Sequence, residues 1–328
     1  MTYDFDVSVL IISFNTRDLT RECLQCIGRE CEGLNAQIIV VDNASLDDSA
    51  AMVASEFPYA TLLRSEVNLG FGNANNLALT HARGRYVVLL NTDAFMAAGA
   101  LKLAMEQMDR TPQCGLAGGK LVGRDGGWQP SARMFHSVAI DAAVLTGMAT
   151  RYPHSRIFGR LDRTWADQNA AAQVDWVPGA FSILRARALA QSGVFDPAFF
   201  LYYEEVDLCR RIQAAGWQVW YWPSIVVTHI GGESSRSMKS LEISSASAQV
   251  ELWRMRSTFL YYRKHHGARA LLAKWMEQSV YFASMLRNRL GKSQERKERA
   301  EHFAALYRLA DQAWADTNGG RTSPQRPW

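Results

Sequence analysis

Two carboxylates in this chain stand directly after apolar runs. Asp42 follows the run QIIVV, and Asp93 follows YVVLLNT. A carboxylate at the end of a core strand must reach solvent or a ligand, because burying it unpaired is costly. Asp42 could accept a hydrogen bond from the ring N–H of a uracil or thymine, or cap the helix expected to start near Ser45. Ser45 itself is also expected to serve as the N-cap of that helix. Asp93 could hold Mg2+ or Mn2+, which prefer oxygen ligands, or simply form a turn.

A third acidic cluster follows the aromatic run at 199–203 and opens a predicted helix. It consists of Glu204, Glu205 and Asp207. Carboxylates are favourable at helix N-termini, so the cluster could serve only to complement the helix dipole. Crowding and aromatic cover could equally raise one carboxyl pKa and produce a general base. Both interpretations stay open for Glu204 and Glu205, whereas Asp207 is expected to brace the local structure.

Two further segments could contact phosphate or metal. His229 follows the short strand IVVTH and precedes two glycines, so it is either a structural histidine or a metal or phosphate ligand. Residues 68–76 read NLGFGNANN, which contains G-x-G but lacks the third glycine of a dinucleotide-binding turn. This segment instead suits a tight turn into a helix whose N-terminus faces a nucleotide.

Alternating strands and helices must position these groups. Apolar runs predict buried strands, and amphipathic stretches predict helices between them. The expected strands are 7–13, 37–41, 60–64 and 86–90, and the expected helices are 16–31, 45–57 and 72–82. This rhythm indicates a parallel, doubly wound sheet. Ligands bind at the carboxyl ends of such strands, where Phe14, Asn15, Asp42 and Asn91 to Asp93 gather.

The second half of the chain is less regular. We expect a helix at 97–110, a glycine-rich strand and turn at 114–129, and a mobile loop at 130–172. A strand at 174–184 is broken at Pro178, and a helix lies within 199–216. Short strands at 218–221 and 225–228 precede a mostly helical region at 241–313.

Composition restricts the class of protein. The chain has 328 residues with 48% hydrophobic and 21% charged residues, which are ordinary values for a globular protein. Five cysteines without framework spacing suit a reducing compartment. No signal peptide and no run of about 18 apolar residues is evident, so we expect a cytoplasmic protein.

The formal net charge of +4 is unevenly distributed, because residues 252–299 hold twelve Lys/Arg against three Asp/Glu. This basic, aromatic and helical segment is either a peripheral membrane contact on the inner face of the cell membrane or a helical cap with a solvated face. No nucleic-acid-binding motif accompanies the charge, so we expect no nucleic-acid partner. The sequence does not indicate an oligomeric state.

Seven segments, in order, resemble the family 2 glycosyltransferases with a GT-A fold, and most closely their rhamnosyltransferase-like branch. The resemblance covers about residues 6–235. The matching segments are VSVLIISFN at 7–15, VVDNASLDDS at 40–49, NLGFGNANN at 68–76, YVVLLNTDA at 86–94, VPGAFSILRARAL at 177–189, FDPAFFLYYEEVDLCRRIQAAGW at 195–217 and VTHIGG at 227–232.

The resemblance implies an α/β, Rossmann-like, mostly parallel twisted sheet flanked by helices, with a C-terminal helical extension. The catalytic domain would span 1–238, with a nucleotide-binding half at about 1–115 and an acceptor half at about 116–238. The helical extension would span 239–315, and 316–328 would be a disordered tail.

The resemblance also implies roles for individual residues. A nucleotide-diphosphate sugar would be bound by Phe14, Asn15, Asp42, Asn68, Asn75 and Asn91. Mg2+ or Mn2+ would be held by Asp93 and His229, with Asn91 at the position where the family's D-x-D motif has its first acidic residue. The catalytic base would be Glu205, with Glu204 as the alternative. A saccharide or lipid-linked acceptor would contact Trp176, Gly179 and Ala180.

The expected activity is inverting sugar transfer in bacterial surface polysaccharide synthesis, with dTDP-rhamnose as the first donor and UDP-hexoses next. A non-catalytic sugar-nucleotide-binding protein of the same fold is the alternative from another class. A nucleotidyltransferase would need a basic phosphate-binding loop near the N-terminus, and residues 13–21 offer little of that.

Overall fold

The computed structural model describes residues 2–231 and 246–324, with side chains at 246 and 247 excepted. These residues form two compact units. The first comprises the described parts of 1–135, 166–197 and 204–239, and the second those of 136–165, 198–203 and 240–328. The boundary near residue 238 expected from the sequence stays a prediction.

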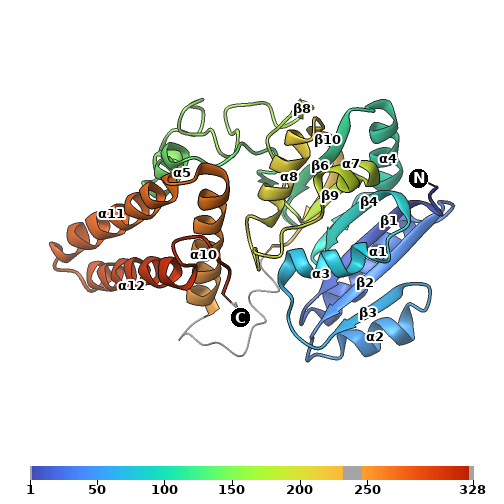
Figure 1. Cartoon of the computed structure of the whole chain (residues 1–328), viewed down its shortest axis with the longest axis horizontal. Coiled ribbons are helices and arrows are strands. Elements are labelled where there is room, and N and C mark those ends of the chain that lie inside the picture. The colour runs from blue at the N-terminus through green and yellow to red at the C-terminus, as the bar shows by residue number, and fades with distance from the viewer. Residues whose placement is uncertain (1, 232–245, 325–328) are drawn as a thin grey trace. The chain divides into compact units, whose positions relative to one another are not determined.

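A parallel half-sheet forms the N-terminal part of the first unit (Figure 1). The strands lie in the order β3-β2-β1-β4 and are parallel throughout. Their bounds are β1 Phe5–Ser13, β2 Ala36–Asn43, β3 Thr61–Ser65 and β4 Gly84–Asn91. The connecting helices are α1 Arg17–Glu30, α2 Ser49–Glu56 and α3 Gly70–Leu79. All four strand ends therefore open on the same edge, as predicted.

The same sheet continues as a mixed sheet, in which β9 and β5 are antiparallel to their neighbours and β6 and β10 are parallel to each other. Its order beyond β4 is β9-β6-β10-β5, with β7 paired to β6 and β8 paired to β10. The strands are β5 Ala94–Met96, β6 Cys114–Val122, β7 Trp128–Gln129, β8 Ala172–Gln173, β9 Phe181–Arg185 and β10 Gln218–His229. The helices are α4 Ala100–Arg110, α7 Ala186–Ser192 and α8 Glu204–Ala214. The expected α/β fold with a mostly parallel core is confirmed.

The strand expected as two pieces at 218–221 and 225–228 is one strand, β10, with an irregular register between Trp222 and Val226. Pro223 lies inside this irregularity. Proline has no N–H to give to a ladder, so it is accommodated where the pairing is interrupted.

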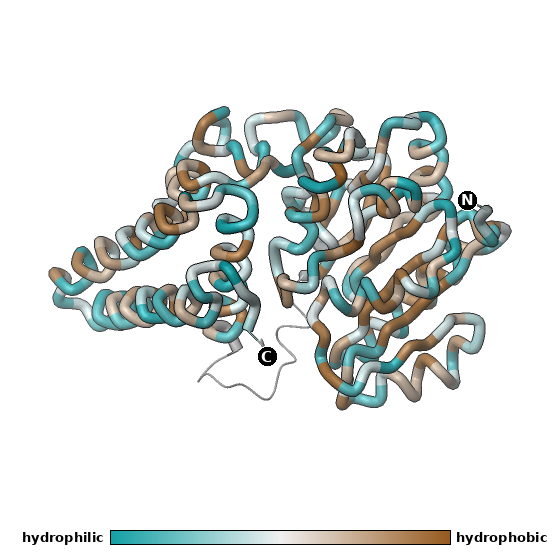
Figure 2. Tube along the Cα trace, viewed as in Figure 1, coloured by the Kyte–Doolittle hydropathy of each residue, from teal (hydrophilic) through white to brown (hydrophobic). Residues whose placement is uncertain are grey.

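The core of the first unit lies on the faces of this sheet (Figure 2). Val9, Ile11, Val40 and Val88 have no exposed surface, as expected for parallel strands covered on both sides. This rigid centre fixes the strand ends that carry the polar groups.

The second unit is largely helical. Its helices are α5 Val138–Leu145, α6 Met148–Arg151, α10 Ala246–His266, α11 Arg269–Arg289 and α12 Gln294–Asp316. A hydrophobic cluster joins them, with Met255, Phe259, Tyr281 and Ala310 buried at its centre. None of the helices in the described ranges is long and apolar enough to cross a membrane.

Two segments are more ordered than the sequence indicated. The region 130–172, expected as a loop, contains α5 and α6, and Ser137 caps α5 by accepting from the Ile140 N–H. In the tail, Thr317 is buried and its hydroxyl donates to the Ala313 carbonyl, while Arg263 donates to the Gly319 carbonyl. The structure thus has hydrogen-bonded turns up to residue 322, and 325–328 lie outside the described residues.

Candidate active site

The loops after β1 and β2 are tied together at the edge of the sheet. The Asn15 side chain accepts a hydrogen bond from the Leu46 N–H at 2.7 Å, and the Asn15 N–H donates to the Ser45 hydroxyl at 3.1 Å. Asn15 and Ala44 both have positive φ angles, 53° and 66°, which few non-glycine residues adopt. Asn15 therefore fixes the loop that follows Asp42. Phe14, the neighbouring predicted residue, is half-buried.

Asp42 is 95% buried, with one oxygen that is not satisfied within the described chain. Its Oδ2 accepts from the Ser45 N–H at 3.4 Å, whereas no described group bonds to the buried Oδ1. Burial raises the pKa of this carboxyl, against the lowering effect of its bonds to Ser45. The prediction that Ser45 caps the next helix is wrong: α2 begins at Ser49, after Asp48. The local turn uses one oxygen of Asp42 and leaves the other for a ligand.

Asn68 and Asn75 shape the entry to α3. Asn68 Oδ1 accepts from the Asn43 side chain at 3.0 Å and from the Gly70 N–H at 2.9 Å. Asn75 is buried within α3, and its amide donates to the Phe71 carbonyl at 2.9 Å. Both amides therefore hold the protein's own backbone beside the strand ends.

Asp93 and His229 are brought together from positions 136 residues apart. Asp93 Oδ1 lies 3.6 Å from His229 Nε2, and Asp93 Oδ2 accepts from the Gly231 N–H at 3.0 Å. The antiparallel pairing of β5 with β10, which aligns Ala94 with His229, produces this proximity. The carboxylate is 6% exposed.

Gln129 holds the opposite side of the His229 ring. Its side-chain NH2 donates to the His229 carbonyl at 2.8 Å, and its Oε1 lies 2.9 Å from His229 Nδ1. Since the amide nitrogen is committed to a carbonyl, the oxygen faces Nδ1 and must accept a proton from it. The Nε2 lone pair is then directed to the Asp93 side. Burial lowers the pKa of His229, against the raising effect of the Asp93 charge, and so favours the neutral ring.

This arrangement fits a divalent cation. A separation of 3.6 Å is too long for a hydrogen bond, yet two ligands each about 2.1 Å from one ion can be up to about 4.2 Å apart. A metal-bound histidine normally donates its other N–H to a fixed acceptor, which is the part Gln129 takes. Within 2–231 and 246–324, no group of three or more His, Cys, Asp or Glu is placed to hold a metal ion, so further ligands would come from substrate or water.

Asn91 and Thr92, which precede Asp93, are held by their surroundings. The Asn91 N–H donates to the Ala180 carbonyl at 3.0 Å, which joins β4 to the segment before β9. Thr92 is buried and accepts from the Thr16 hydroxyl at 3.1 Å. The half-buried Asn91 side chain lies at the strand end expected to face the nucleotide.

The acidic residues of α8 differ in their surroundings. Glu204 is 3% exposed, and burial together with the Glu205 charge holds its pKa well above the usual range. Glu205 is half-buried. Asp207 is fully buried and accepts from Arg211 at 2.8 Å, and Arg211 also donates to the Ser192 and Val194 carbonyls. Asp207 thus braces α8 against the end of α7, as the sequence indicated.

A series of close contacts links the Asp93 side of the sheet to α8. Gly179, next to Ala180, lies so close to the Phe71 ring that an added Cβ would be 2.9 Å from it. At Gly72, an added Cβ would meet the Glu204 Cβ at 3.4 Å. Glycine at these two positions therefore allows α3 to lie close to the segment before β9 and to the start of α8. The convergence of Asp93 and Glu205 on one cleft stays a prediction that these contacts favour.

Trp176 is 5% exposed, and its ring N–H donates to the Met134 carbonyl at 2.9 Å. Arg133 lies over its ring, 5.0 Å from the centroid. Gly179 and Ala180 are also buried. The three residues predicted to bind the acceptor sugar are therefore buried within the segment between β8 and β9.

Sequence reasoning missed several polar residues of this region. Gln129 carries no motif, and the sequence marks Asn43 only by its place at the end of an apolar run. Asn76 clamps the backbone of Phe195 by donating to its carbonyl and accepting from its N–H. The only available signal for Asn76 was its place in the asparagine-rich segment 68–76.

The parallel half-sheet, its mixed continuation and the flanking helices define the class of the fold, which is GT-A. Comparison with known proteins agrees: residues 8–168 match the family model "Glycosyl transferase family 2". The chain contains a family 2 glycosyltransferase domain and is a glycosyltransferase enzyme.

Two relatives match along most of their length. The N-acetylglucosaminyl-diphospho-decaprenol L-rhamnosyltransferase of Mycobacterium tuberculosis is 27% identical over 277 residues, which covers 79% of this chain and 86% of the relative. The rhamnosyltransferase WbbL of Escherichia coli is 25% identical over 273 residues, which covers 78% and 92%. A solved mannosyltransferase from Pyrobaculum calidifontis, in complex with GDP-Man and Mn2+, shares the fold with a TM-score of 0.55 at 17% identity, covering 96% of this chain and 88% of that one.

Proposed function

We propose that this enzyme transfers L-rhamnose from dTDP-rhamnose to a hydroxyl of a saccharide or lipid-linked acceptor, with inversion at the anomeric carbon, in bacterial surface polysaccharide synthesis. The choice of rhamnose is supported by the two relatives named as rhamnosyltransferases. A lipid-linked acceptor is supported by the decaprenol-linked sugar in the name of the first. UDP-hexoses are the second donor class, because uracil and thymine present the same ring N–H.

The observation that carries the proposal is the Asp93–His229 pair with Gln129 behind it. These residues would hold Mg2+ or Mn2+ next to the donor diphosphate. A cation bound there supplies charge neutralisation for the departing diphosphate. The protein's contribution is to present one carboxylate oxygen and one imidazole lone pair in fixed positions.

Asp42 supports the choice of thymine or uracil as the base of the donor nucleotide. Its buried Oδ1 would accept the ring N–H of thymine or uracil, which compensates the desolvation that raises the pKa of this carboxyl. Asn15, Asn68, Asn75 and Asn91 would support or line the same pocket, with Phe14 beside them. Cytosine and adenine lack a matching ring N–H.

The chemical step follows from the position of Glu205 at the start of α8. Its carboxylate would take the proton of the acceptor hydroxyl as that oxygen bonds to the anomeric carbon. The bond from this carbon to the diphosphate oxygen breaks, and its electron pair leaves with the nucleotide diphosphate. Glu204 is less suited to act as the base, because burial and the neighbouring Glu205 charge raise the pKa of its carboxyl.

The acceptor would approach the segment that includes Gly179 and Ala180, with Trp176 supporting it from below. An acceptor on a lipid carrier requires the enzyme to reach a bilayer surface. Peripheral membrane contact is therefore part of the proposal, and α11 offers the surface for it.

The test is a thermal-shift screen of nucleotide sugars with and without Mn2+. A ligand that binds only the folded protein at 100 times its dissociation constant stabilises it by about 2.7 kcal/mol. We expect dTDP-rhamnose with Mn2+ to raise the melting temperature most, and ADP- and CDP-sugars to have little effect. If UDP-hexoses give a larger shift, they replace dTDP-rhamnose as the proposed donor. If no thymine or uracil nucleotide gives a shift, the proposed site is refuted.

A further inference from the structure

The outward side of α11 carries an apolar stripe that no described residue covers. Trp275 is 56% exposed, and Leu272 and Leu290 are 50% and 87% exposed. The stripe consists of Leu271, Leu272, Trp275, Phe282, Leu286 and Leu290. Positions 271, 275, 282 and 286 recur at helical spacing, so they share one side of the helix along about 22 Å.

The opposite side of α11 already packs inside the second unit. Ala273, Glu277 and Tyr281 are buried there, and α12 lies alongside (Figure 1). Glu277 accepts from Arg254 at 2.7 Å and from the Tyr281 hydroxyl at 2.8 Å. The exposed stripe is thus not the face by which this helix joins its core.

Cations accompany the stripe without acidic partners. Arg269, Arg287, Arg289 and Lys292 are exposed, and none forms an ion pair with a residue in the described ranges. Arg269 and Arg287 are separated by about five helical turns, so they lie along the same flank. The one acidic residue of α11 is the buried Glu277.

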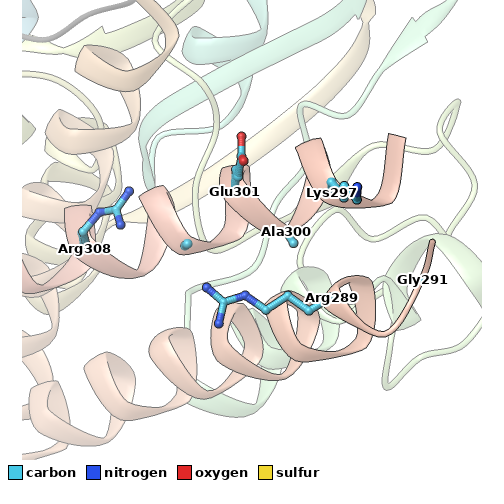
Figure 3. A pocket seen from close by; sticks show the side chains of 7 residues that line it. Arg289, Gly291, Lys297, Ala300, Glu301 and Arg308 are labelled. Carbon is cyan, nitrogen blue, oxygen red and sulfur yellow. The ribbon is translucent and has the colours of Figure 1, made fainter. Parts of the chain in front are cut away.

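A cationic pocket of about 360 Å³ lies at the C-terminal end of α11, between this helix and α12. Arg289, Lys297 and Arg308 line it, with Glu301 as the one carboxylate. Figure 3 shows the guanidinium group of Arg289 lying between the two helices. The pocket has the charge and size to receive a phosphate group of a lipid.

We propose that α11 is the membrane-binding element of this enzyme and lies along an anionic bilayer surface, with its apolar stripe among the acyl chains nearest the headgroups. Basic residues beside Leu, Phe and Trp are the composition that favours this placement. A second copy of the chain fits less well, because a symmetric pairing of these surfaces would bring like charges together.

The proposed membrane-binding surface includes only part of the basic segment 252–299. In α10, Trp253, Phe259, Tyr261 and Tyr262 are buried in the second unit and belong to its core. The helical-cap interpretation therefore describes α10, and the membrane interpretation is confined to α11 and the pocket beside it. The inference deepens the proposed lipid-linked acceptor, but vesicle binding can be measured without any donor.

The experiment is co-flotation of the full chain with vesicles of phosphatidylcholine, with and without phosphatidylglycerol. One double variant, Leu272→Ser with Trp275→Ser, alters the stripe, and another, Arg287→Glu with Lys292→Glu, alters the charge. The matched controls are Leu46→Ser with Ile157→Ser, which are 93% and 73% exposed in the parent, and Lys102→Glu with Arg187→Glu. Since all these positions are exposed, melting temperatures should match the parent.

We expect the parent and both controls to float with the anionic vesicles, and each α11 variant to lose about tenfold or more in partitioning. The proposal is overturned if the parent does not bind, or if the α11 variants bind like the controls. It is also overturned if the parent sediments as a dimer that the stripe variant converts to a monomer while neither binds vesicles. If the melting temperature of the stripe variant is lower than that of the parent, co-flotation of the single variant Trp275→Ser is used instead to test the proposal.

Discussion

Glu204 and Glu205 are adjacent in the chain, yet their environments give them different chemistry. The buried Glu204 has a strongly raised pKa, whereas Glu205 is half-buried. A general base must be ionised before the reaction, so the less buried residue is the better candidate. The two residues can be separated by isosteric amide substitutions.

Glu205→Gln should lower the rate of sugar transfer by about 10²- to 10⁴-fold, because general-base catalysis contributes about this much. The thermal shift produced by the donor nucleotide should be retained. Transfer is measured by release of nucleoside diphosphate, with Glu106→Gln on the surface of α4 as the control. If Glu205→Gln stays active and Glu204→Gln does not, the base is Glu204.

Glu204→Gln should instead change how stability depends on pH. The folded-state pKa of Glu204 lies above its ordinary value of 4.5, so the folded protein holds this proton more tightly than the unfolded chain. That contribution to stability is complete below the unfolded pKa and is lost as pH rises through the folded pKa. Glutamine mimics the protonated form at every pH.

The melting temperature of Glu204→Gln should therefore exceed that of the parent at neutral pH, and the difference should vanish toward about pH 4. Differential scanning calorimetry across pH 4 to 8 measures this. A difference that is constant with pH would mean that Glu204 is not held protonated by the fold.

Gln129 is predicted to position His229 for metal binding. Gln129→Leu removes the acceptor of the Nδ1 proton, so the ring can turn or adopt the other tautomer. Affinity for Mn2+ in the presence of nucleoside diphosphate should fall about 10- to 100-fold, as for other partners behind metal ligands. Bound Mn2+ is measured by electron paramagnetic resonance.

The 15N chemical shifts of the His229 ring provide a second measurement, since they report which nitrogen carries the proton. The Gln113→Leu variant removes an exposed glutamine elsewhere and should change neither quantity. An unchanged Mn2+ affinity together with an unchanged tautomer in Gln129→Leu would leave Gln129 with a purely structural role.

At the scale of elements, two glycines lie where α3 meets its neighbours: Gly179 faces Phe71, and Gly72 faces the start of α8. Gly179→Ala would place a methyl group 2.9 Å from the Phe71 ring, which itself packs edge-on against Phe195. Overpacking of this kind typically costs about 1–3 kcal/mol. Urea denaturation measures the loss, and in a Phe71→Leu background the same substitution should cost less. Equal costs in both backgrounds would contradict the contact.

The elements of the first half could be predicted because each has its own local signal. Strands β1, β2 and β4 are continuous apolar runs, and α1 has a clear amphipathic pattern. The carboxyl ends of such strands locate Asp42 and Asp93 without any knowledge of tertiary structure.

The rest of the site depends on pairing between distant segments. Gln129 meets His229 because β7 pairs with β6 and β6 pairs with β10, a relation across 100 residues that leaves no sequence pattern. The prediction that Ser45 caps the next helix fails for a similar reason, since the Ser45 hydroxyl accepts a hydrogen bond from the Asn15 N–H of a neighbouring loop. Long-range hydrogen bonds of this kind override local capping preferences.

At the scale of the molecule, the proposed chemistry and the proposed membrane contact lie in different units. The groups proposed for the donor, Asp42, Asp93, Gln129 and His229, all belong to the first unit. The stripe and cations of α11 belong to the second. The two functions should therefore respond separately to their ligands.

Hydrogen–deuterium exchange provides the test. The donor nucleotide with Mn2+ should slow amide exchange around residues 42–46, 91–93 and 229–231, because ligand contacts stabilise these strand ends against local opening. Exchange in α11 should not change. Anionic vesicles without nucleotide should slow exchange in α11 and leave the strand ends unaffected. If the donor alone protects α11, the nucleotide site includes the helical unit, and the assignment of binding to the first unit by itself is wrong.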